Sequence, residues 1–347
     1  MEKKIVTFGE VLLRFSKNDH LRLSQGSRMM GNYGGSEANA AVSLAMFGNR
    51  VEYVTRVPDN TLGHAALMRL REYGLNVDHV CMGGNRLGTY YFEEAAAVRN
   101  SKVVYDRKDS SFYSMQPGMI PWREVFADAH LFHCSGITCA VSQSAQDATF
   151  EAVRTADEMG LTIACDINYR KNLWNYGAKA SEVLHRLMQY SDFVFGDQNE
   201  WEVVSGLPHI PFEALDADYE LNLAAYEEYF AQLHKQFPRC GQMLMGLRNQ
   251  ITTSHHTLSG ILWSAEGGGK GKLYTTRIYN IDPVIDPMGV GDAFVAGFLH
   301  ARGRWGGDLQ RCLDFSLAAS QLKNSVTGDF NLVTEDEVLE QMENVED

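Results

Sequence analysis

Short apolar runs alternate with longer helical patterns along most of this 347-residue chain. The runs have the length of buried strands, and an alternation of this kind is typical of a parallel sheet wrapped by helices. The predicted strands are Ile5–Gly9, Val51–Val57, His130–Ser135, Leu161–Ile167, Asp192–Phe195 and Met243–Leu247. The predicted helices are Glu37–Phe47, Leu62–Tyr73, Ala145–Met159, Ala178–Tyr190, Asn222–Phe237, Asp292–Arg304 and Gly307–Lys323.

Two segments interrupt this alternation. Thr89–Glu93 and Lys102–Arg107 have the residue types of strands and are joined by a short polar loop, with no helix between them. They are predicted to form an antiparallel hairpin. Together with Leu12–Ser16 they would make a small sheet apart from the main one, formed by about residues 12–16 and 88–108. Such a sheet could be a lid or a contact between two subunits.

The composition favours one α/β domain that spans residues 1–347, because a chain of this length can bury a large core. Lys and Arg total 31 against 44 Asp and Glu, a net charge of -13, which argues against nucleic acid or an anionic membrane as a partner. The six cysteines form no Cys-x-x-Cys pair, and the sequence has no signal-peptide core and no apolar run of membrane-spanning length. We therefore expect a cytoplasmic protein with reduced thiols.

The residues from Asp286 to Asp292 read Asp-Pro-Met-Gly-Val-Gly-Asp and lead into an apolar helical run. The two glycines allow a tight turn that points the N–H groups of Gly289, Val290 and Gly291 at one place, where the helix adds the positive end of its dipole. This combination predicts an anion hole. Asp292 at its edge is predicted to take the proton of a hydroxyl that attacks phosphorus. The alternative is a stabilising turn with an Asp near a helix N-terminus.

A second glycine pair, Gly34 and Gly35, precedes a helix whose first turn contains Asn39. Paired glycines let a ligand touch the backbone, and an Asn side chain can both donate and accept hydrogen bonds. These residues therefore fit a site for a polyol such as a sugar. A helix cap explains them about equally well.

Two groups of polar residues follow predicted strands, where open α/β sheets place ligand-binding side chains. Asp166-Ile167-Asn168-Tyr169-Arg170 ends in an arginine that can form a bidentate pair with a carboxylate or a phosphate. Asn199-Glu200-Trp201-Glu202 follows the next strand and, on spacing alone, would be only a helix start.

The two glycine motifs, in this order, resemble the signatures of the ribokinase-like (phosphofructokinase-B) carbohydrate kinases, and the resemblance covers nearly the whole chain. It implies a three-layer α/β/α fold with a central, mostly parallel sheet and a small β-sheet lid. It also implies that Asp292 is the catalytic base, and that ATP and Mg²⁺ are bound. The implied nucleotide-binding residues are Asn199, Glu202, Arg248, Gly289 and Gly291, with Glu202 supporting the metal through water.

Within this family the chain is most similar to the 2-keto-3-deoxygluconate kinases. The implied substrate-binding residues are Gly34, Gly35, Asn39, Tyr90, Tyr105, Arg107, Ile137, Arg170, Asp292 and Asp329. Fructokinase-type relatives resemble Gly-Glu-x-x-x-Asp-Phe at the first strand, and their Asp holds sugar hydroxyls. Arg14 stands at that position here, and it would not repel a carboxylate as an Asp would. This difference favours a sugar acid over a neutral hexose.

The resemblance thus implies an ATP-dependent kinase that phosphorylates the terminal hydroxyl of 2-keto-3-deoxygluconate, acting as a homodimer or higher homo-oligomer. Two alternatives stay open: a kinase for another sugar, such as fructose or a nucleoside, and a sugar-acid sensor that binds without turnover. The chain departs from the family at Gly246–Gln250, where Arg248 replaces the usual Lys or Thr, so the phosphate donor is open. A monovalent cation is a possible further cofactor.

Overall fold

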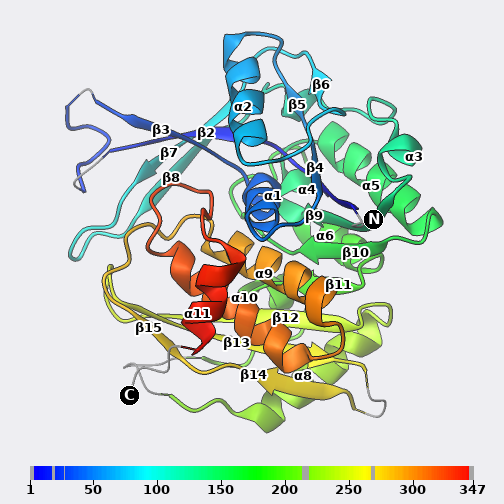
Figure 1. Ribbon diagram of the computed structural model, residues 1–347, viewed down its shortest axis with the longest axis vertical. Helices are drawn as coiled ribbons and strands as arrows, with labels where there is room; N and C mark the ends of the chain where they lie inside the picture. The colour runs from blue at the N-terminus through cyan, green and yellow to red at the C-terminus, as the bar shows by residue number, and fades with distance from the viewer. Residues whose placement is uncertain (1–3, 18–19, 27, 213–218, 267–269, 344–347) are drawn as a thin grey trace.

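The computed structural model describes residues 4–17, 20–26, 28–212, 219–266 and 270–343. Its centre is a nine-stranded sheet with the order β14-β13-β12-β11-β10-β9-β1-β4, and β15 pairs with β13 (Figure 1). The six strands from β4 to β12 in this order are parallel, and β13, β14 and β15 are antiparallel to their neighbours. The strands are β1 (Lys4–Phe8), β4 (Val51–Val54), β9 (Ala129–Ser135), β10 (Thr162–Asp166), β11 (Phe193–Phe195), β12 (Gln242–Gln250), β13 (His256–Ser264), β14 (Lys272–Thr275) and β15 (Tyr279–Ile281).

Helices cover both faces of this sheet. Successive strand residues point to opposite faces, so that Ile5 and Leu131 pack in one hydrophobic core while Val6 and Phe132 pack in the other. The helices of the first core are α1 (Ser36–Met46), α2 (Thr61–Glu72), α9 (Val290–Trp305), α10 (Leu309–Lys323) and α11 (Glu335–Glu343). The helices of the second core are α3 (Trp122–Val125), α4 (Gly136–Ala140), α5 (Gln143–Glu158), α6 (Ala180–Met188), α7 (Gln198–Ser205) and α8 (Leu223–Gln236). The predicted three-layer α/β/α fold is confirmed.

The predicted strands and helices are present within a few residues of their predicted bounds, with one split. Val51–Val57 becomes β4 and a separate short strand, β5 (Arg56–Val57), which pairs with β6 (Cys81–Met82) outside the main sheet. The strands after β12 were not predicted, because β13 mixes polar and apolar residues (His-Thr-Leu-Ser-Gly-Ile-Leu-Trp-Ser) although it is buried along its whole length. All six cysteines are free thiols, and among the described residues no helix has the length and apolarity to cross a membrane.

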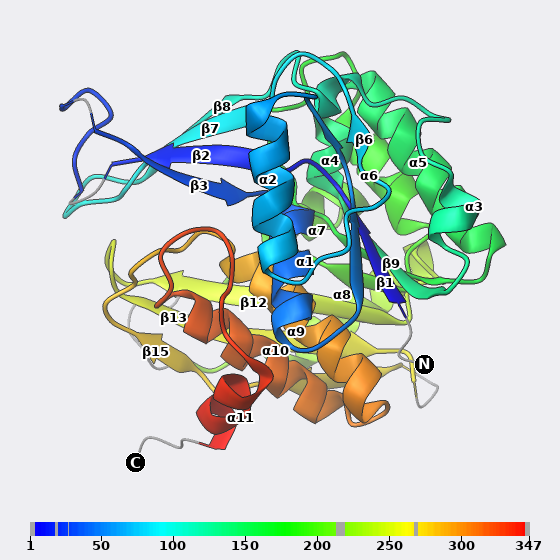
Figure 2. The ribbon, with the colours of Figure 1, turned by 45° about the horizontal axis from the view of Figure 1, so that its top comes forward.

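The predicted small sheet extends away from the body as a lid (Figure 2). It has four strands in the order β3-β2-β7-β8, where β2 is Leu12–Ser16, β7 is Gly88–Glu93 and β8 is Lys102–Asp106. The fourth strand, β3 (Met30–Gly34), was not predicted, because its sequence Met-Gly-Asn-Tyr-Gly contains three residues of low strand propensity. Tyr90 pairs with Tyr105 and Tyr91 with Val104, so alternate residues form an inner face toward the body and an outer face.

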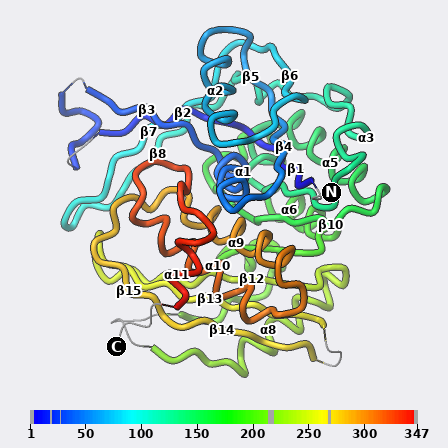
Figure 3. Tube along the Cα trace, viewed as in Figure 1, coloured from blue at the N-terminus to red at the C-terminus, as the bar shows by residue number. Residues whose placement is uncertain are grey.

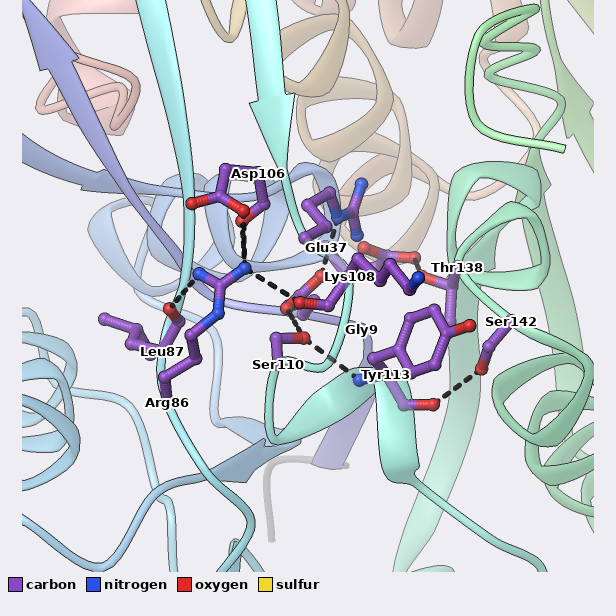
Figure 4. Close-up of polar contacts among 12 residues, drawn as sticks. Gly9, Glu37, Arg86, Leu87, Asp106, Lys108, Ser110, Tyr113, Thr138 and Ser142 are labelled. Atoms are coloured by element: carbon purple, nitrogen blue, oxygen red, sulfur yellow. Dashed lines mark hydrogen bonds and ion pairs between the residues drawn. The ribbon is translucent and has the colours of Figure 1, made fainter. Parts of the chain in front are cut away.

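The base of the lid is joined to the body by polar contacts (Figure 4). The guanidinium of Arg86 donates to Asp106 Oδ1 at 2.6 Å and to the backbone carbonyl of Lys108 at 2.8 Å, which closes the lower end of the β7–β8 hairpin. Ser110 then donates to Glu10 Oε1 at 2.5 Å and accepts from the backbone N–H of Tyr113 at 3.0 Å. The lid is therefore fixed to the segment that follows β1.

Helix α9 lies between α1 and α10, although α1 and α9 come from opposite ends of the chain (blue and orange in Figure 3). The close approach of α9 and α10 requires Gly297, because a Cβ at this position would lie 2.8 Å from Ser316 Cα. Ser316 Oγ also donates to the carbonyl of Phe294. These contacts hold the helix that begins at the predicted anion hole.

We expect Gly297→Ala to lower the free energy of unfolding by roughly 1–3 kcal/mol, because the added methyl group pushes α9 away from α10. Gly303→Ala is the matched control. It changes the same residue type in the same helix, but a Cβ there meets nothing within 4 Å, so we expect a gain of roughly 0.5–1 kcal/mol. Urea unfolding of both variants measures the difference, and equal effects would contradict the described packing.

Candidate active site

The Asp292 carboxylate lies in the first turn of α9 and is held by the first turn of α1. Ser36 Oγ donates to its Oδ1 at 2.8 Å, and Asn39 Nδ2 donates to its Oδ2 at 2.7 Å. Asn168 Nδ2 in turn donates to Ser36 Oγ at 2.8 Å. Burial raises the pKa of Asp292, and the hydrogen bonds from Asn39 and Ser36 oppose that shift. The carboxylate is therefore oriented by two hydrogen bonds that favour its ionised form.

The start of α1 is itself fixed by Glu37. This buried side chain accepts a hydrogen bond from the backbone N–H of Ser135 at 3.1 Å and another from the Thr138 hydroxyl, seen in Figure 4. Burial raises the pKa of Glu37 to about 7. Gly35, the residue before α1, has φ 143°, and a Cβ on it would lie 2.1 Å from the Glu10 carbonyl. Gly35 is thus required by the backbone path at this point.

The predicted anion hole has the expected backbone form. Gly289 is the N-cap of α9 with φ 80°, and Val290 and Gly291 begin the helix, so their free N–H groups face outward from the helix end. A Cβ on Gly289 would lie 2.1 Å from the Asp329 carbonyl oxygen, which explains why a glycine is needed there. The Asp329 loop therefore supports the anion hole from behind.

A cavity of about 330 Å³ opens in front of this loop. It lies at the carboxyl ends of β10, β11 and β12, where parallel sheets bind ligands. Its polar and loop-forming lining residues include Asp166, Asn168, Arg170, Asp197, Glu200, Arg248, Ser259, Gly289, Val290, Gly291, Asp292 and Ser320. The structure thus brings Asp292, the anion hole and two of the predicted arginines, Arg170 and Arg248, to one cavity.

Arg170 stands beside acidic side chains at the cavity wall. Its Nη1 lies 3.8 Å from Glu200 Oε1, which is a long ion pair, and its side chain is 47 % exposed. Glu200 also accepts the backbone N–H of Tyr169 at 2.8 Å. Burial raises the pKa of Glu200 to about 7 and raises that of Asp166 as well. Arg170 therefore keeps donor capacity that a ligand anion can use.

Arg248 is the second cation of the cavity. It lies on β12, and within the described ranges no carboxylate is close enough to form an ion pair with it. Burial lowers the pKa of Arg248, and the charge of Asp197 opposes that shift. A guanidinium that has no ion pair among the described residues and lines the same cavity as the anion hole is suited to a phosphate group.

Several predicted substrate residues form a cluster between the lid and the anion hole instead of lining the cavity. The Tyr90 hydroxyl donates to Asp329, and Asp329 also packs against Gly34, whose Cβ would lie 2.4 Å from its Oδ1. The ring of Tyr105 lies 6.1 Å from that of Tyr90. Burial raises the pKa of Asp329 to about 6, and the charge of Arg14 opposes this. In this arrangement Asp329 Oδ1 accepts from Tyr90, whereas among the described residues the buried Oδ2 has the ion pair with Arg14 and no hydrogen bond.

The structure places two of the predicted arginines outside the cavity. Arg107 is buried, and its Nε donates to Glu10 Oε2 at 2.6 Å, so it holds the lid to the body and does not face the cavity. Arg14 is buried too, with its Nη2 2.6 Å from Asp286 Oδ2 and its Nε 3.2 Å from Asp329 Oδ2. The charge of Arg14 balances these two carboxylates, so the presence of Arg14 does not by itself indicate an acidic substrate.

Four other predicted residues also lie elsewhere. Asn39 was expected to bind sugar hydroxyls, but its amide is directed at Asp292. Ile137 is buried in α4, and Asn199 is exposed on α7 outside the cavity. The expected metal-linked acid, Glu202, points outward and pairs with His209.

The carboxylate of α7 that faces the cavity is Glu200. It is the third residue of the helix and forms a capping box with Asp197. The sequence analysis predicted Glu202, but an Asp three residues before a Glu is the pattern of a capping box, and this pattern indicates Glu200. Sequence reasoning also assigned no role to Ser36, to Asn168 or to Lys323, a buried residue at the end of α10.

Comparison with known proteins identifies the family of this chain. The model of the pfkB family carbohydrate kinases matches residues 2–240 and 255–335. The chain belongs to the pfkB family of carbohydrate kinases. The 2-dehydro-3-deoxygalactonokinase of Haloferax volcanii is 29% identical to it over 97% of this chain and 96% of the relative. The crystal structure of 2-dehydro-3-deoxygluconokinase from Thermotoga maritima superposes with a TM-score of 0.89 at 32% identity and covers 99% of this chain and 100% of that one.

A second solved structure, a PfkB family carbohydrate kinase from Listeria grayi, has a TM-score of 0.87 and 30% identity over 99% of this chain and 100% of that one. The predicted family and enzyme class are thus confirmed: the chain is a phosphotransferase with an alcohol group as acceptor. The cavity of this carbohydrate kinase contains the groups that such a transfer needs, namely an oriented carboxylate and an anion hole.

We expect Asp292→Asn to lower kcat by about 10²–10⁴-fold, because the amide keeps the shape of the carboxylate but cannot accept a proton. Sugar and ATP should still bind to the variant. In the wild type, kcat should fall as the pH decreases through the raised pKa of Asp292, since the base must be ionised to act. Initial rates from pH 4 to 9, with calorimetric titration of both ligands, measure these effects. A variant with near-normal kcat would exclude Asp292 as the base.

Proposed function

We propose that this carbohydrate kinase transfers the γ-phosphoryl group of ATP to the terminal hydroxyl of a six-carbon 2-keto-3-deoxy sugar acid. The names of its relatives support this substrate class, since they include a 2-dehydro-3-deoxygalactonokinase and the 2-dehydro-3-deoxygluconokinases of Bacillus subtilis and Thermotoga maritima. The observation that carries the proposal is Arg170, a half-exposed arginine in the cavity of Asp292 that keeps donors free for a carboxylate.

In the proposed reaction, Asp292 accepts the hydroxyl proton while the hydroxyl oxygen forms a bond to the γ-phosphorus. The bond from that phosphorus to the β-γ bridging oxygen breaks, and ADP leaves with the electron pair. The N–H groups of Gly289–Gly291 and the N-terminus of α9 stabilise the charge on the transferred group. Ser36 and Asn39 keep the carboxylate in place during the transfer.

The residues present fit a magnesium ion held mainly by phosphate oxygens and water, which is the usual mode for Mg²⁺. Asp166 and Glu200 supply carboxylate oxygens in the cavity and would bind the hydrated ion. Such an ion would neutralise phosphate charge. Arg248 would contact the nucleotide phosphates.

A coupled ADP-release assay tests the substrate class. We expect 2-keto-3-deoxygluconate, its galactonate epimer or 5-dehydro-2-deoxygluconate to be used with a kcat/KM about 10–100-fold above that for fructose or a nucleoside, because a charged hydrogen bond contributes roughly 1.5–3 kcal/mol. A preference for a neutral sugar would overturn the proposal. Binding of sugar acids without turnover would indicate a sensor.

Arg170→Ala should raise the KM for the sugar acid by about 10–100-fold with a smaller effect on the KM for ATP, for the same energetic reason. Arg248→Ala is the matched control, because it removes the other cavity guanidinium and should mainly raise the KM for ATP. Initial rates with each substrate varied in turn measure both effects. If Arg170→Ala mainly raised the KM for ATP and Arg248→Ala that for the sugar acid, the two arginines would have to be assigned to the opposite substrates.

We further propose that the outer face of the lid joins two copies of the chain. This face carries Phe15 stacked on Tyr91, with ring centroids 5.7 Å apart, and Val104, which is 53 % exposed. A small sheet with an exposed apolar face is marginally stable alone and needs a covering surface. A twofold contact would cover both lids at once.

Size-exclusion chromatography with light scattering should show a dimer for the wild type and a monomer for Val104→Asp, since a buried carboxylate in the contact is costly. Val98→Asp is the control, because Val98 is fully exposed in the loop between β7 and β8, away from the sheet face. A monomeric wild type at micromolar concentration would refute the proposed contact.

A further inference from the structure

Lys323, the last residue of α10, is a lysine with no solvent exposure beside the active site. Its Nζ donates to the carbonyl of Val326 at 2.8 Å and lies 3.4 Å from the carbonyl of Asp286. Within the described ranges, both recorded acceptors are backbone oxygens, and neither is a carboxylate. An ammonium taken out of water needs such oxygens, because its burial is otherwise very costly.

The two carbonyls belong to the two segments that form the anion hole. Asp286 begins the turn that leads to Gly289 and α9, and Val326 begins the turn that leads to Asp329. These turns touch where Gly289 packs against the Asp329 carbonyl, and Lys323 Cε lies 3.4 Å from the Cβ position of Gly289. The ammonium therefore joins both turns directly behind the phosphate-binding backbone.

The carboxylates near Lys323 are paired with another cation, so its ammonium is available to bind the two backbone carbonyls. Asp286 and Asp329 are both buried, and both are paired with Arg14 on the lid strand β2. Burial lowers the pKa of Lys323 to about 8, although the charges of Asp286 and Asp329 oppose the shift, so the amine is mostly protonated at pH 7. Two buried carboxylates are thus balanced by two buried cations.

Backbone carbonyls near carboxylates also form the environment that hard metal cations prefer. We propose that the Lys323 ammonium is a built-in cation that positions the anion hole, so that this chain needs no monovalent metal ion at that place. Lys323 is a positioning residue in this proposal, since it acts through the backbone of the 286–292 turn and touches neither substrate.

Two substitutions of Lys323 test the proposal: one fills the volume of the lysine side chain, and the other leaves space for an ion. Lys323→Met removes the charge and keeps the volume, and we expect kcat to fall about 10–100-fold, as for other residues that support an active site from behind. The kcat of Lys323→Ala should fall by a similar factor, but this substitution leaves a space where the ammonium was. Added K⁺ or NH₄⁺ should therefore restore much of the kcat of Lys323→Ala and none of the kcat of Lys323→Met. Lys235→Met, an exposed lysine at the end of α8, is the control and should change nothing.

The wild-type kcat should be the same in sodium, potassium and choline chloride, and a requirement for potassium would overturn the proposal. Undiminished kcat in both Lys323 variants would overturn it too.

The rate measurements rest on the proposed kinase activity, but hydrogen–deuterium exchange of the 286–292 peptide needs no substrate. Faster exchange in Lys323→Met than in Lys235→Met supports the positioning role. Unchanged exchange, with the same thermal unfolding temperature, contradicts it independently of the sugar.

Discussion

The balance of four buried charges holds the candidate active site of this kinase together. Arg14 comes from the lid, Asp286 from the turn before α9, and Asp329 and Lys323 from the end of the domain. None of these groups could be buried alone without a large desolvation cost, so each one depends on the others. Because the anion hole belongs to the Asp286 segment and packs against the Asp329 segment, this mutual dependence also determines where its N–H groups point.

The lid and the catalytic turn are therefore not independent parts. Arg14 connects the inner face of the lid with the turn before α9, and the ion pair between Arg107 and Glu10 connects the lid base with the end of β1. A lid fastened by two buried ion pairs resists bending at its base. Movement to admit a sugar would then occur farther out, along the strands and loops beyond these anchors.

The residue pattern was sufficient to predict the parallel sheet, most helices, the lid hairpin and the family, because these depend on local periodicity and on two glycine motifs. The residue pattern was insufficient to predict which side chains contact each other. Arg107 and Arg170 have the same chemistry in the sequence, and only the fold shows that Glu10 pairs with one while the other faces the cavity. Glu200 was missed in favour of Glu202 because a shift of two residues turns a helical side chain to another face. Lys323 has no local signal, since its partners are backbone carbonyls of distant turns.

The hydrogen bond between Ser36 and Asp292 links residues 256 positions apart, and the bond from Asn39 spans 253. Contacts of such long range close large loops and form slowly during folding. During synthesis on the ribosome, almost the entire chain must be made before Asp292, the partner of the first turn of α1, exists. A fragment that ends before α9 could build most of the parallel sheet and still have no oriented carboxylate, so catalytic competence is among the last properties this chain acquires as it folds.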